Sequence, residues 1–364
     1  MVARFFDTRA AYTMFVNATD EKVVVADRIA READSLELSQ PGLRVFDAGM
    51  GDGALLTNLM RRLHRKWTYV PWLVVAKEIS IEDVRQGIAR LPDRFLEHPE
   101  MVVVVTNLRF SEAPDLRIGD SGRWREVALE GTTSAEFGEQ ITDLYPQLAE
   151  DWQVTTSEKS GNPIPVHPAA LILYRNDHRF LLQPLVPVRD GTIRYDLAIA
   201  SQAYRARTPL HRKVSLVVAP LARALAPGGR LIGVHAAGDD PGMDIIHSVW
   251  PEEKPFPHGR EDVVAEAAHH LGSDPALRFP ELSDGDAIFR FVLHTMPSEE
   301  AANIGTSSVV AAWNAATYVA QIDEDRLADA MSSGSYLDAT RAVMEKHGQI
   351  WWNDELFIVE RLAG

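Results

Sequence analysis

The residues of this chain best suited to hold a ligand lie in the segment RVFDAGMGDG, residues 44–53, where three glycines alternate with other residues. An apolar strand pattern precedes the glycines, and an amphipathic helix pattern follows them. Such a turn brings backbone amides close to a ligand, because a side chain at those positions would block the approach. We therefore predict a nucleotide-type ligand at Gly49, Gly51 and Gly53. The alternative is a tight strand-to-helix turn that binds nothing.

Two carboxylates indicate which ligand this loop prefers. Asp47 precedes the first glycine, and Asp52 lies where the pyrophosphate of a dinucleotide would lie. A carboxylate repels phosphate and attracts cations. S-adenosylmethionine has no phosphate and carries a sulfonium and an amino group, so the acidic loop fits this ligand better than it fits NAD. No Gly-Lys-Ser/Thr follows, which excludes a Walker A loop.

The segment FDAGMGDG, residues 46–53, resembles the first motif of class I S-adenosylmethionine-dependent methyltransferases. The resemblance implies that Asp47 and the three glycines hold the methionine part of the cofactor. It also implies that an acidic residue at the end of the second strand, here Glu78, accepts hydrogen bonds from both ribose hydroxyls. A solvated strand end is the alternative for Glu78. Near the adenine the resemblance implies a polar residue after the third strand, where this chain has Asn107 in place of the commoner aspartate.

The end of the fourth strand, YDLAIASQAY, is the candidate acceptor site. It resembles, in degenerate form, the Asp/Asn/Ser-Pro-Pro-Tyr/Phe motif of the members of that family that methylate amines, with Gln202 and Ala203 replacing both prolines. The resemblance implies two catalytic residues. Ser201 would accept a hydrogen bond from the acceptor amine, and Tyr204 would pack against a planar group. The alternative is a strand end that only lines the cofactor.

Histidines and aromatic residues elsewhere provide further candidates. His235 follows the fifth strand and could act as a general base for a hydroxyl acceptor. The histidines lack paired spacing with carboxylates, so we predict no metal site. Near the N-terminus, docking of an apolar first helix is favoured over an aromatic lid above the substrate, and the aromatic residues concerned are Phe5, Phe6, Tyr12 and Phe15.

Strand and helix patterns alternate along the chain, which predicts an α/β fold with a doubly wound, Rossmann-like parallel sheet. Seven strands are expected, as the resemblance to the methyltransferases also implies, at residues 43–49, 72–80, 101–108, 195–202, 230–238, 288–296 and 355–362. Ligands of such sheets lie at the carboxyl ends of the strands, near the point where the strand order reverses.

The pattern divides the chain into a core and three additional segments. We expect a helical segment at 1–40, an inserted α+β subdomain at 112–190 and a helical insertion at 297–355, and a core formed by 41–111, 191–296 and 356–364. Within the subdomain, two apolar runs around the polar turn RNDH predict a hairpin. We expect this subdomain to govern substrate choice; a role in oligomerisation is the alternative.

Composition restricts the partners and the compartment. Lys and Arg number 37 against 52 Asp and Glu, which gives a formal net charge of −15. Such a charge disfavours nucleic acid and anionic membranes as partners and favours a small-molecule substrate. The absence of cysteine excludes disulfides, thiolate metal sites and a cysteine nucleophile. The absence of cysteine also suits a cytoplasmic protein. The first residues show no secretory signal, which agrees with that expectation. A homo-oligomer stays open.

Together these patterns predict an S-adenosylmethionine-dependent methyltransferase that acts on a small molecule, with an amine nitrogen as the candidate acceptor. An aminopropyltransferase resembling spermidine synthase would share the fold but would be expected to show acidic residues after the fourth strand. An NAD-dependent oxidoreductase is disfavoured by the acidic loop. A regulatory protein that binds S-adenosylmethionine without turnover is the third alternative.

Overall fold

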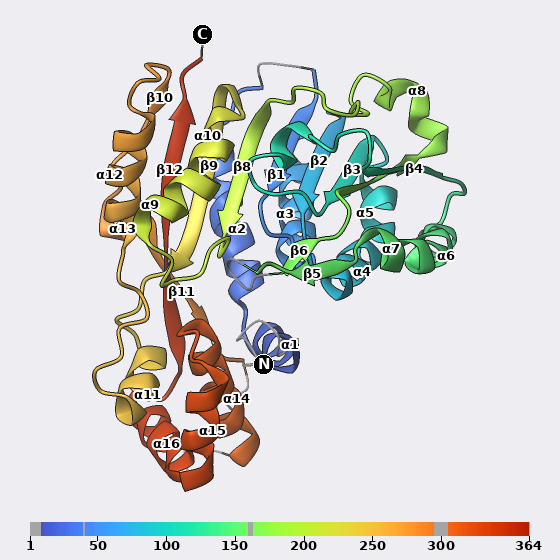
Figure 1. Cartoon of the computed structure of the whole chain (residues 1–364). Coiled ribbons are helices and arrows are strands. Elements are labelled where there is room, and N and C mark those ends of the chain that lie inside the picture. The colour runs from blue at the N-terminus through green and yellow to red at the C-terminus, as the bar shows by residue number, and fades with distance from the viewer. Residues whose placement is uncertain (1–8, 39–40, 159–162, 295–304, 364) are drawn as a thin grey trace.

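A computed structural model describes residues 9–38, 41–158, 163–294 and 305–363. Within these ranges, the main sheet contains ten strands, and nine of them follow the order β10-β12-β9-β8-β1-β2-β3-β7-β4, with β11 paired to β12. Helices cover both faces of the sheet (Figure 1). The α/β fold expected from the sequence is therefore confirmed.

All seven expected strands are present in the main sheet: β1 (Leu43–Asp47), β2 (Trp72–Lys77), β3 (Met101–Thr106), β8 (Tyr195–Ser201), β9 (Leu225–Ala236), β11 (Ile288–Val292) and β12 (Trp351–Arg361). Strands β3, β2, β1, β8 and β9 are parallel neighbours, and β12 runs antiparallel to β9 and to β11. From β1 the chain winds outward to β2 and β3, and then returns to β8 on the other side of β1. The strand order therefore reverses between β1 and β8, where ligands of doubly wound sheets bind.

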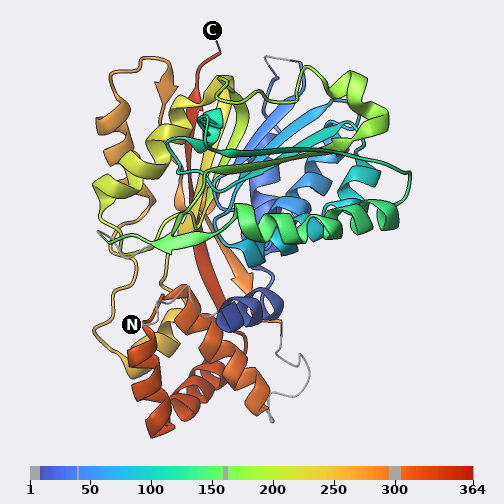
Figure 2. The ribbon, with the colours of Figure 1, turned by 45° about the vertical axis from the view of Figure 1, so that its right-hand side comes forward.

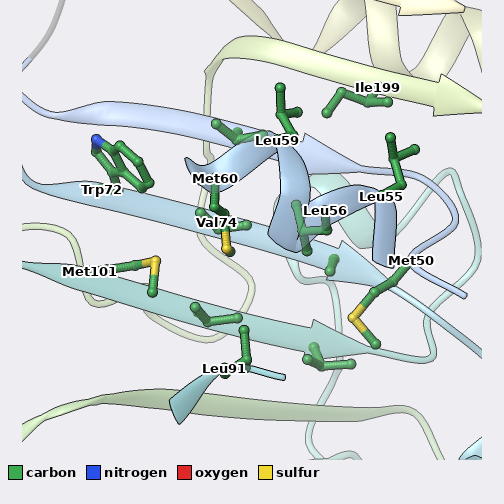
Figure 3. Close-up of a cluster of buried hydrophobic side chains, with 14 of the residues drawn as sticks. Met50, Leu55, Leu56, Leu59, Met60, Trp72, Val74, Leu91, Met101 and Ile199 are labelled. Carbon is green, nitrogen blue, oxygen red and sulfur yellow. The ribbon is translucent and has the colours of Figure 1, made fainter. Parts of the chain in front are cut away.

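One face of the sheet is covered by helices from the first half of the chain: α2 (Glu21–Ala33), α3 (Ala54–Lys66), α4 (Ile81–Ala89), α5 (Pro92–Glu97), α6 (Ser134–Asp143) and α7 (Tyr145–Asp151). Helix α3 is typical: its apolar residues recur on one side, and Leu55, Leu56 and Leu59 are buried against the sheet (Figure 3). Ser80 caps α4, its hydroxyl accepting a hydrogen bond from the backbone N–H of Asp83 at 3.3 Å.

The opposite face is covered by helices that come later in the chain: α8 (Arg179–Leu182), α9 (Leu210–Lys213), the π-helical turn η4 (Val214–Val218), α10 (Ala219–Arg223) and α12 (Arg260–Leu271). Burial on both faces explains why the central strands read as continuous apolar runs. The MVVVV run of β3, for example, is buried at every position.

The segment 112–190 extends the sheet and does not form the separate subdomain that we expected. Its strand β7 (Ala169–Arg175) pairs antiparallel with β3, and β4 (Arg123–Leu129) pairs parallel with β7. The expected hairpin is wrong, because the chain after β7 passes through a 3₁₀ turn into α8. Two prolines, Pro184 and Pro187, lie in the second apolar run, and proline cannot donate to a strand ladder.

Helix α1 and four helices from the C-terminal part of the chain form a second packed unit at one end of the sheet (Figures 1 and 2). It contains α1 (Arg9–Ala18), α11 (Pro241–Val249), α14 (Thr306–Val319), α15 (Glu324–Ser333) and α16 (Ser335–His347). The expected helical segment at 297–355 is thus found in part. Strand β12 already begins at Trp351, and the N-terminal segment divides between this unit and the sheet.

Candidate functional site

The three glycines of the loop after β1 have different surroundings. Gly51 and Gly53 adopt φ angles of 53° and 77°, which favour glycine. A Cβ on Gly53 would lie 2.7 Å from Cα of Gly87, so this glycine permits close packing of α3 on α4. A Cβ on Gly51 would lie 2.8 Å from the hydroxyl of Tyr12, whereas the nearest neighbour of one on Gly49 is the carbonyl of Ser201, at 3.9 Å. Gly49 is therefore the glycine with open space beside it.

Asp47 ends β1 with one carboxylate oxygen unsatisfied. Its Oδ1 accepts a hydrogen bond from the N–H of Gly49 at 3.0 Å, while Oδ2 is buried and has no hydrogen-bond partner among the described residues. Burial raises the pKa of Asp47 to about 6. An unpaired buried carboxylate oxygen is costly, so this position favours a ligand that donates a hydrogen bond or carries positive charge.

Glu78 lies beside the glycine loop, directly after β2. Its Oε2 accepts from the N–H of Gly51 at 2.9 Å, and its Oε1 accepts from the N–H groups of Ile79 and Ser80 at 2.7 and 2.9 Å. The carboxylate thus ties the end of β2 to the loop. A carboxylate has about four acceptor positions, so about one remains for a sugar hydroxyl. Ribose binding by Glu78 stays a prediction.

Asp52 does not present a free charge, and our expectation for it is wrong. Its Oδ2 forms an ion pair with Arg90 at 2.8 Å, and its Oδ1 accepts from the hydroxyl of Tyr12 at 3.1 Å. The nearby arginine compensates the negative charge that we expected to repel a phosphate. The preference of the loop for a cationic ligand therefore depends on Asp47.

Asn107 is buried, and its amide is occupied by backbone groups of the inserted segment. The side-chain oxygen accepts from the N–H of Ala169 at 2.7 Å, and the nitrogen donates to the carbonyl of His167 at 3.0 Å. Asn107 therefore holds the start of β7 against the end of β3. Contact with an adenine stays a prediction.

Three buried polar side chains, Asp47, Ser201 and Asp354, gather on one face of the sheet at its ligand-binding edge; we call them the edge cluster. Side chains alternate between the two faces of a strand, so residues two positions apart share a face. Two positions along the strand from each of the three side chains lies an apolar residue of the core that α2 and α3 cover. Ser201 Oγ and Asp354 Oδ2, like Asp47 Oδ2, have no hydrogen-bond partner among the described residues.

Charged groups surround the edge cluster. Burial raises the pKa of Asp354 well above its usual range, and the charge of Glu21 at the start of α2 adds to the rise. Glu21 is itself buried and forms an ion pair with Lys22 at 2.8 Å. Sequence reasoning missed Asp354 and Glu21 because they come from an antiparallel strand and a helix outside the motif. The only sequence signal was the adjacent acidic residues Asp354 and Glu355 in the apolar segment WWNDELFIVE.

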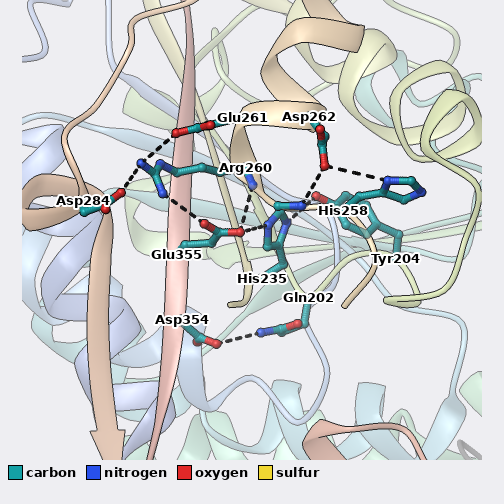
Figure 4. A network of polar contacts seen from close by, with 11 residues as sticks. Gln202, Tyr204, His235, His258, Arg260, Glu261, Asp262, Asp284, Asp354 and Glu355 are labelled. Atoms are coloured by element: carbon teal, nitrogen blue, oxygen red, sulfur yellow. Dashed lines mark hydrogen bonds and ion pairs between the residues drawn. The ribbon is translucent and has the colours of Figure 1, made fainter. Parts of the chain in front are cut away.

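Tyr204 belongs to a hydrogen-bonded chain on the other face of the sheet (Figure 4). Its hydroxyl lies 2.9 Å from Nδ1 of His235, whose Nε2 lies 2.9 Å from Oε1 of Glu355. Arg260 donates to Glu355 from its backbone at 2.8 Å and from its guanidinium at 3.2 Å. A carboxylate only accepts, so Nε2 of His235 donates to Glu355. The two predicted catalytic residues, Ser201 and Tyr204, therefore project to opposite faces.

Gln202 connects the two faces. It has a φ of 49°, an uncommon value for a residue other than glycine, and its side-chain nitrogen donates to Asp354 Oδ1 at 3.3 Å. Together with Tyr204 and His235 it also lines a small pocket on the other face. Strained backbone of this kind is concentrated at functional sites.

Helix α1 docks on the C-terminal helical unit, as favoured from the sequence. Phe15 is buried and stacks on Tyr318, with ring centroids 4.7 Å apart. The adjacent turn carries Tyr12 over the glycine loop. Phe5 and Phe6 lie outside the described residues. Hydrophobic docking thus places one aromatic hydroxyl directly beside the candidate site.

In the part of the chain that the structure describes, no group of three or more His, Cys, Asp or Glu residues could hold a metal ion. Among those same residues, no helix is both long and apolar enough to cross a bilayer.

Comparisons with known proteins give distant likenesses only. No family model matches the chain, and no curated protein matches it. Among solved structures, a geranyl diphosphate methyltransferase in complex with GPP and sinefungin is 12% identical, with 93% of this chain and 78% of that chain covered and a TM-score of 0.35. A loganic acid methyltransferase with SAH is 9% identical, with 94% of each chain covered and a TM-score of 0.32. An rRNA methyltransferase from Streptomyces viridochromogenes is 17% identical over 58% of this chain and 73% of that chain, with a TM-score of 0.25.

Proposed function

We propose that this protein is an S-adenosylmethionine-dependent methyltransferase that acts on a small molecule. The observation that carries the proposal is the unpaired, buried Oδ2 of Asp47 beside the open space at Gly49. That arrangement favours a ligand with a cationic donor and disfavours the phosphates of a dinucleotide. The sheet also departs from the usual dinucleotide-binding arrangement after its fifth strand, because β12 is antiparallel.

The residues around the loop fit the cofactor chemically. Asp47 would accept from its amino group, Gly49 leaves room for its backbone, and Glu78 has an acceptor position for a ribose hydroxyl. Tyr12 limits the space over Gly51. When bound, the cofactor supplies a methyl group already activated by the sulfonium. The protein's task is then mainly to position the acceptor and to exclude water.

The acceptor that we propose is an amine nitrogen. Ser201 Oγ and Asp354 Oδ2 are buried, lack partners among the described residues and share a sheet face with Asp47. Both can accept hydrogen bonds from an amine N–H, which would orient the nitrogen lone pair away from them. Tyr204 would line the acceptor pocket from the other face.

One observation also favours aminopropyl transfer as a second candidate. The acidic residues expected of a polyamine site are absent after the fourth strand, but Asp354 and Glu21 provide buried carboxyl groups near it. A polyamine is a cation that such groups could hold. The two candidates differ in the cofactor, since an aminopropyltransferase uses the decarboxylated form.

Calorimetry tests the proposal. We expect S-adenosylmethionine and its demethylated product to bind, NAD not to bind, and decarboxylated S-adenosylmethionine to bind more weakly. Asp47→Asn should reduce the affinity for S-adenosylmethionine at least tenfold, while the control Asp143→Asn, at an exposed position, should leave it unchanged. Binding of NAD alone would refute the proposal. Tighter binding of the decarboxylated cofactor would favour the second candidate.

A further inference from the structure

A buried lysine without an anionic partner lies next to the candidate acceptor site. Lys213, the last residue of α9, is 2% exposed. Among the described residues, its ammonium has neither an ion pair nor a hydrogen bond, and its closest aromatic contact is the ring of Tyr204, with Nζ 5.1 Å from the centroid. Burial lowers the pKa of Lys213, and the charge of Asp262 offsets this only in part. An ammonium buried in this way is destabilising unless an anion accompanies it.

The pocket that Lys213 faces is lined mainly by polar side chains. It is lined by Lys213 together with Gln202, Tyr204, His235, Phe256 and His258. The cation–π contact with Tyr204 holds the ammonium in place but supplies no negative charge.

The nearby carboxylates are engaged elsewhere. Glu355 accepts hydrogen bonds from His235 and Arg260, and Arg260 in turn pairs with Asp284 at 2.6 Å (Figure 4). Asp262 accepts from the N–H of Gly259 at 3.2 Å, and its Oδ2 lies 3.9 Å from Nδ1 of His258, which lines the pocket. The pocket is therefore left with the positive charge of Lys213, which an anionic ligand would balance.

We propose that this pocket holds a carboxylate of the acceptor, with Lys213 as its counter-ion. The inference rests on the proposed function and narrows it, because the acceptor then becomes an amine that also carries a carboxylate. Gln202 lies between the pocket and the edge cluster. It lines the pocket, follows Ser201 in the chain and donates to Asp354. In this proposal the acceptor reaches past Gln202, with its carboxylate in the pocket and its amine at the edge cluster.

The first test is an acetate titration of the protein without cofactor, followed by NMR. Acetate should bind to the wild-type chain and shift the signals of residues that line the pocket. Lys213→Met should weaken acetate binding at least tenfold, because methionine keeps the length and the apolar stem but removes the charge. The matched control is Lys254→Met, which removes the same charge from an exposed position on the nearby loop.

Thermal denaturation shows whether Lys213→Met folds, and we expect its Tm to be equal to or above that of the wild type. Should this variant not fold, competition in the wild type replaces it: acetate should compete with a carboxylate-bearing acceptor and not with its methyl ester. Acetate binding that is unchanged in a folded Lys213→Met, or shifts confined to residues outside the pocket, would overturn the proposal. So would Lys213-dependent binding of inorganic phosphate without binding of acetate.

The two proposals can fail separately. Loss of the carboxylate site would leave the affinity for S-adenosylmethionine intact, since Lys213 lies away from the glycine loop on the opposite face of the sheet. Conversely, acetate binding without any binding of S-adenosylmethionine would refute the proposed function and confirm the anion site.

Discussion

The proposed cofactor site depends above all on one atom, the buried Oδ2 of Asp47. Its burial without a partner means that the native state carries a carboxylate that would be more stable if protonated. Because its pKa rises from 3.8 to about 6 on folding, the native state binds more protons than the unfolded chain within that range. The contribution of Asp47 to stability therefore falls as the pH rises through this window.

Asp47→Asn should for this reason stabilise the cofactor-free protein at pH 8 by on the order of 1–3 kcal/mol. The Oδ1 of asparagine keeps the hydrogen bond from Gly49, and the ionised form is removed. Urea denaturation at pH 8 and at pH 4 would measure this, and the gain should shrink at the lower pH. A variant that is less stable than the wild type at pH 8 would contradict the assigned cause.

Glu78 gives a second prediction at this scale. Glu78→Ala should weaken binding of S-adenosylmethionine by on the order of 1.5–3 kcal/mol, since both the proposed sugar acceptor and the anchor of the loop are lost. Hydrogen exchange of the Gly51 amide should accelerate as well, because its acceptor is Glu78 Oε2. Glu139→Ala, at an exposed helical position, is the control. Faster exchange with unchanged affinity would leave Glu78 with the anchoring role alone.

The residues of the site differ in how far the sequence could predict them. Asp47, the glycines and Glu78 follow one another along a local strand-turn-helix pattern, so their neighbourhood could be predicted. Asp354 comes to the same edge from β12, more than 300 residues away, through antiparallel pairing that no local pattern encodes. Ser201 and Tyr204 were predicted as a pair, yet the chain turns at Gln202 and sends them to different faces.

At the scale of elements, the contact between α1 and the glycine loop has a testable role. Gly51→Ala would place a methyl group 2.8 Å from the hydroxyl of Tyr12 at a φ of 53°, so both a clash and backbone strain result. We expect a loss of stability of about 1–2 kcal/mol and loss of cofactor binding. In a Tyr12→Phe background, which lacks only the hydroxyl, the cost of Gly51→Ala should fall by the part due to the clash. Thermal denaturation would measure both; full recovery would show that backbone strain is negligible.

The elements themselves were predicted where periodicity is strong. The strands and helices of the core follow from apolar runs and amphipathic patterns. The partners of β7 and β4 do not, because strand pairing depends on contacts far apart in the sequence. Two apolar runs separated by a polar turn resembled a hairpin, and only the prolines in the second run opposed that interpretation.

At the scale of the whole molecule, the position of β7 determines whether the chain stays soluble when segment 112–190 is removed. All of β7 is buried, and it covers the edge of β3, whose residues are buried as well. Replacing the segment by a short Gly/Ser linker should therefore expose an apolar edge and yield insoluble protein. Removing only the ribbon at 153–166 should leave a soluble chain, because the described residues of its strands β5 (Val154–Thr156) and β6 (Pro163–Pro165) lie outside the main sheet. Sedimentation would compare the two, and a soluble, folded product of the larger deletion would contradict this prediction.

The placement of β12 has a consequence for the order of folding. Of the described strands it is the last in the chain, yet it lies between β9 on one side and β10 (Leu277–Arg278) and β11 on the other. Such non-local pairing forms slowly, because the loop entropy is lost before the contacts are gained. Pulsed hydrogen exchange during refolding should thus protect the amides of β1 before those of β12. A chain caught midway would already hold its glycine loop but would still lack Asp354 and Glu355, and so its proposed acceptor site would be incomplete.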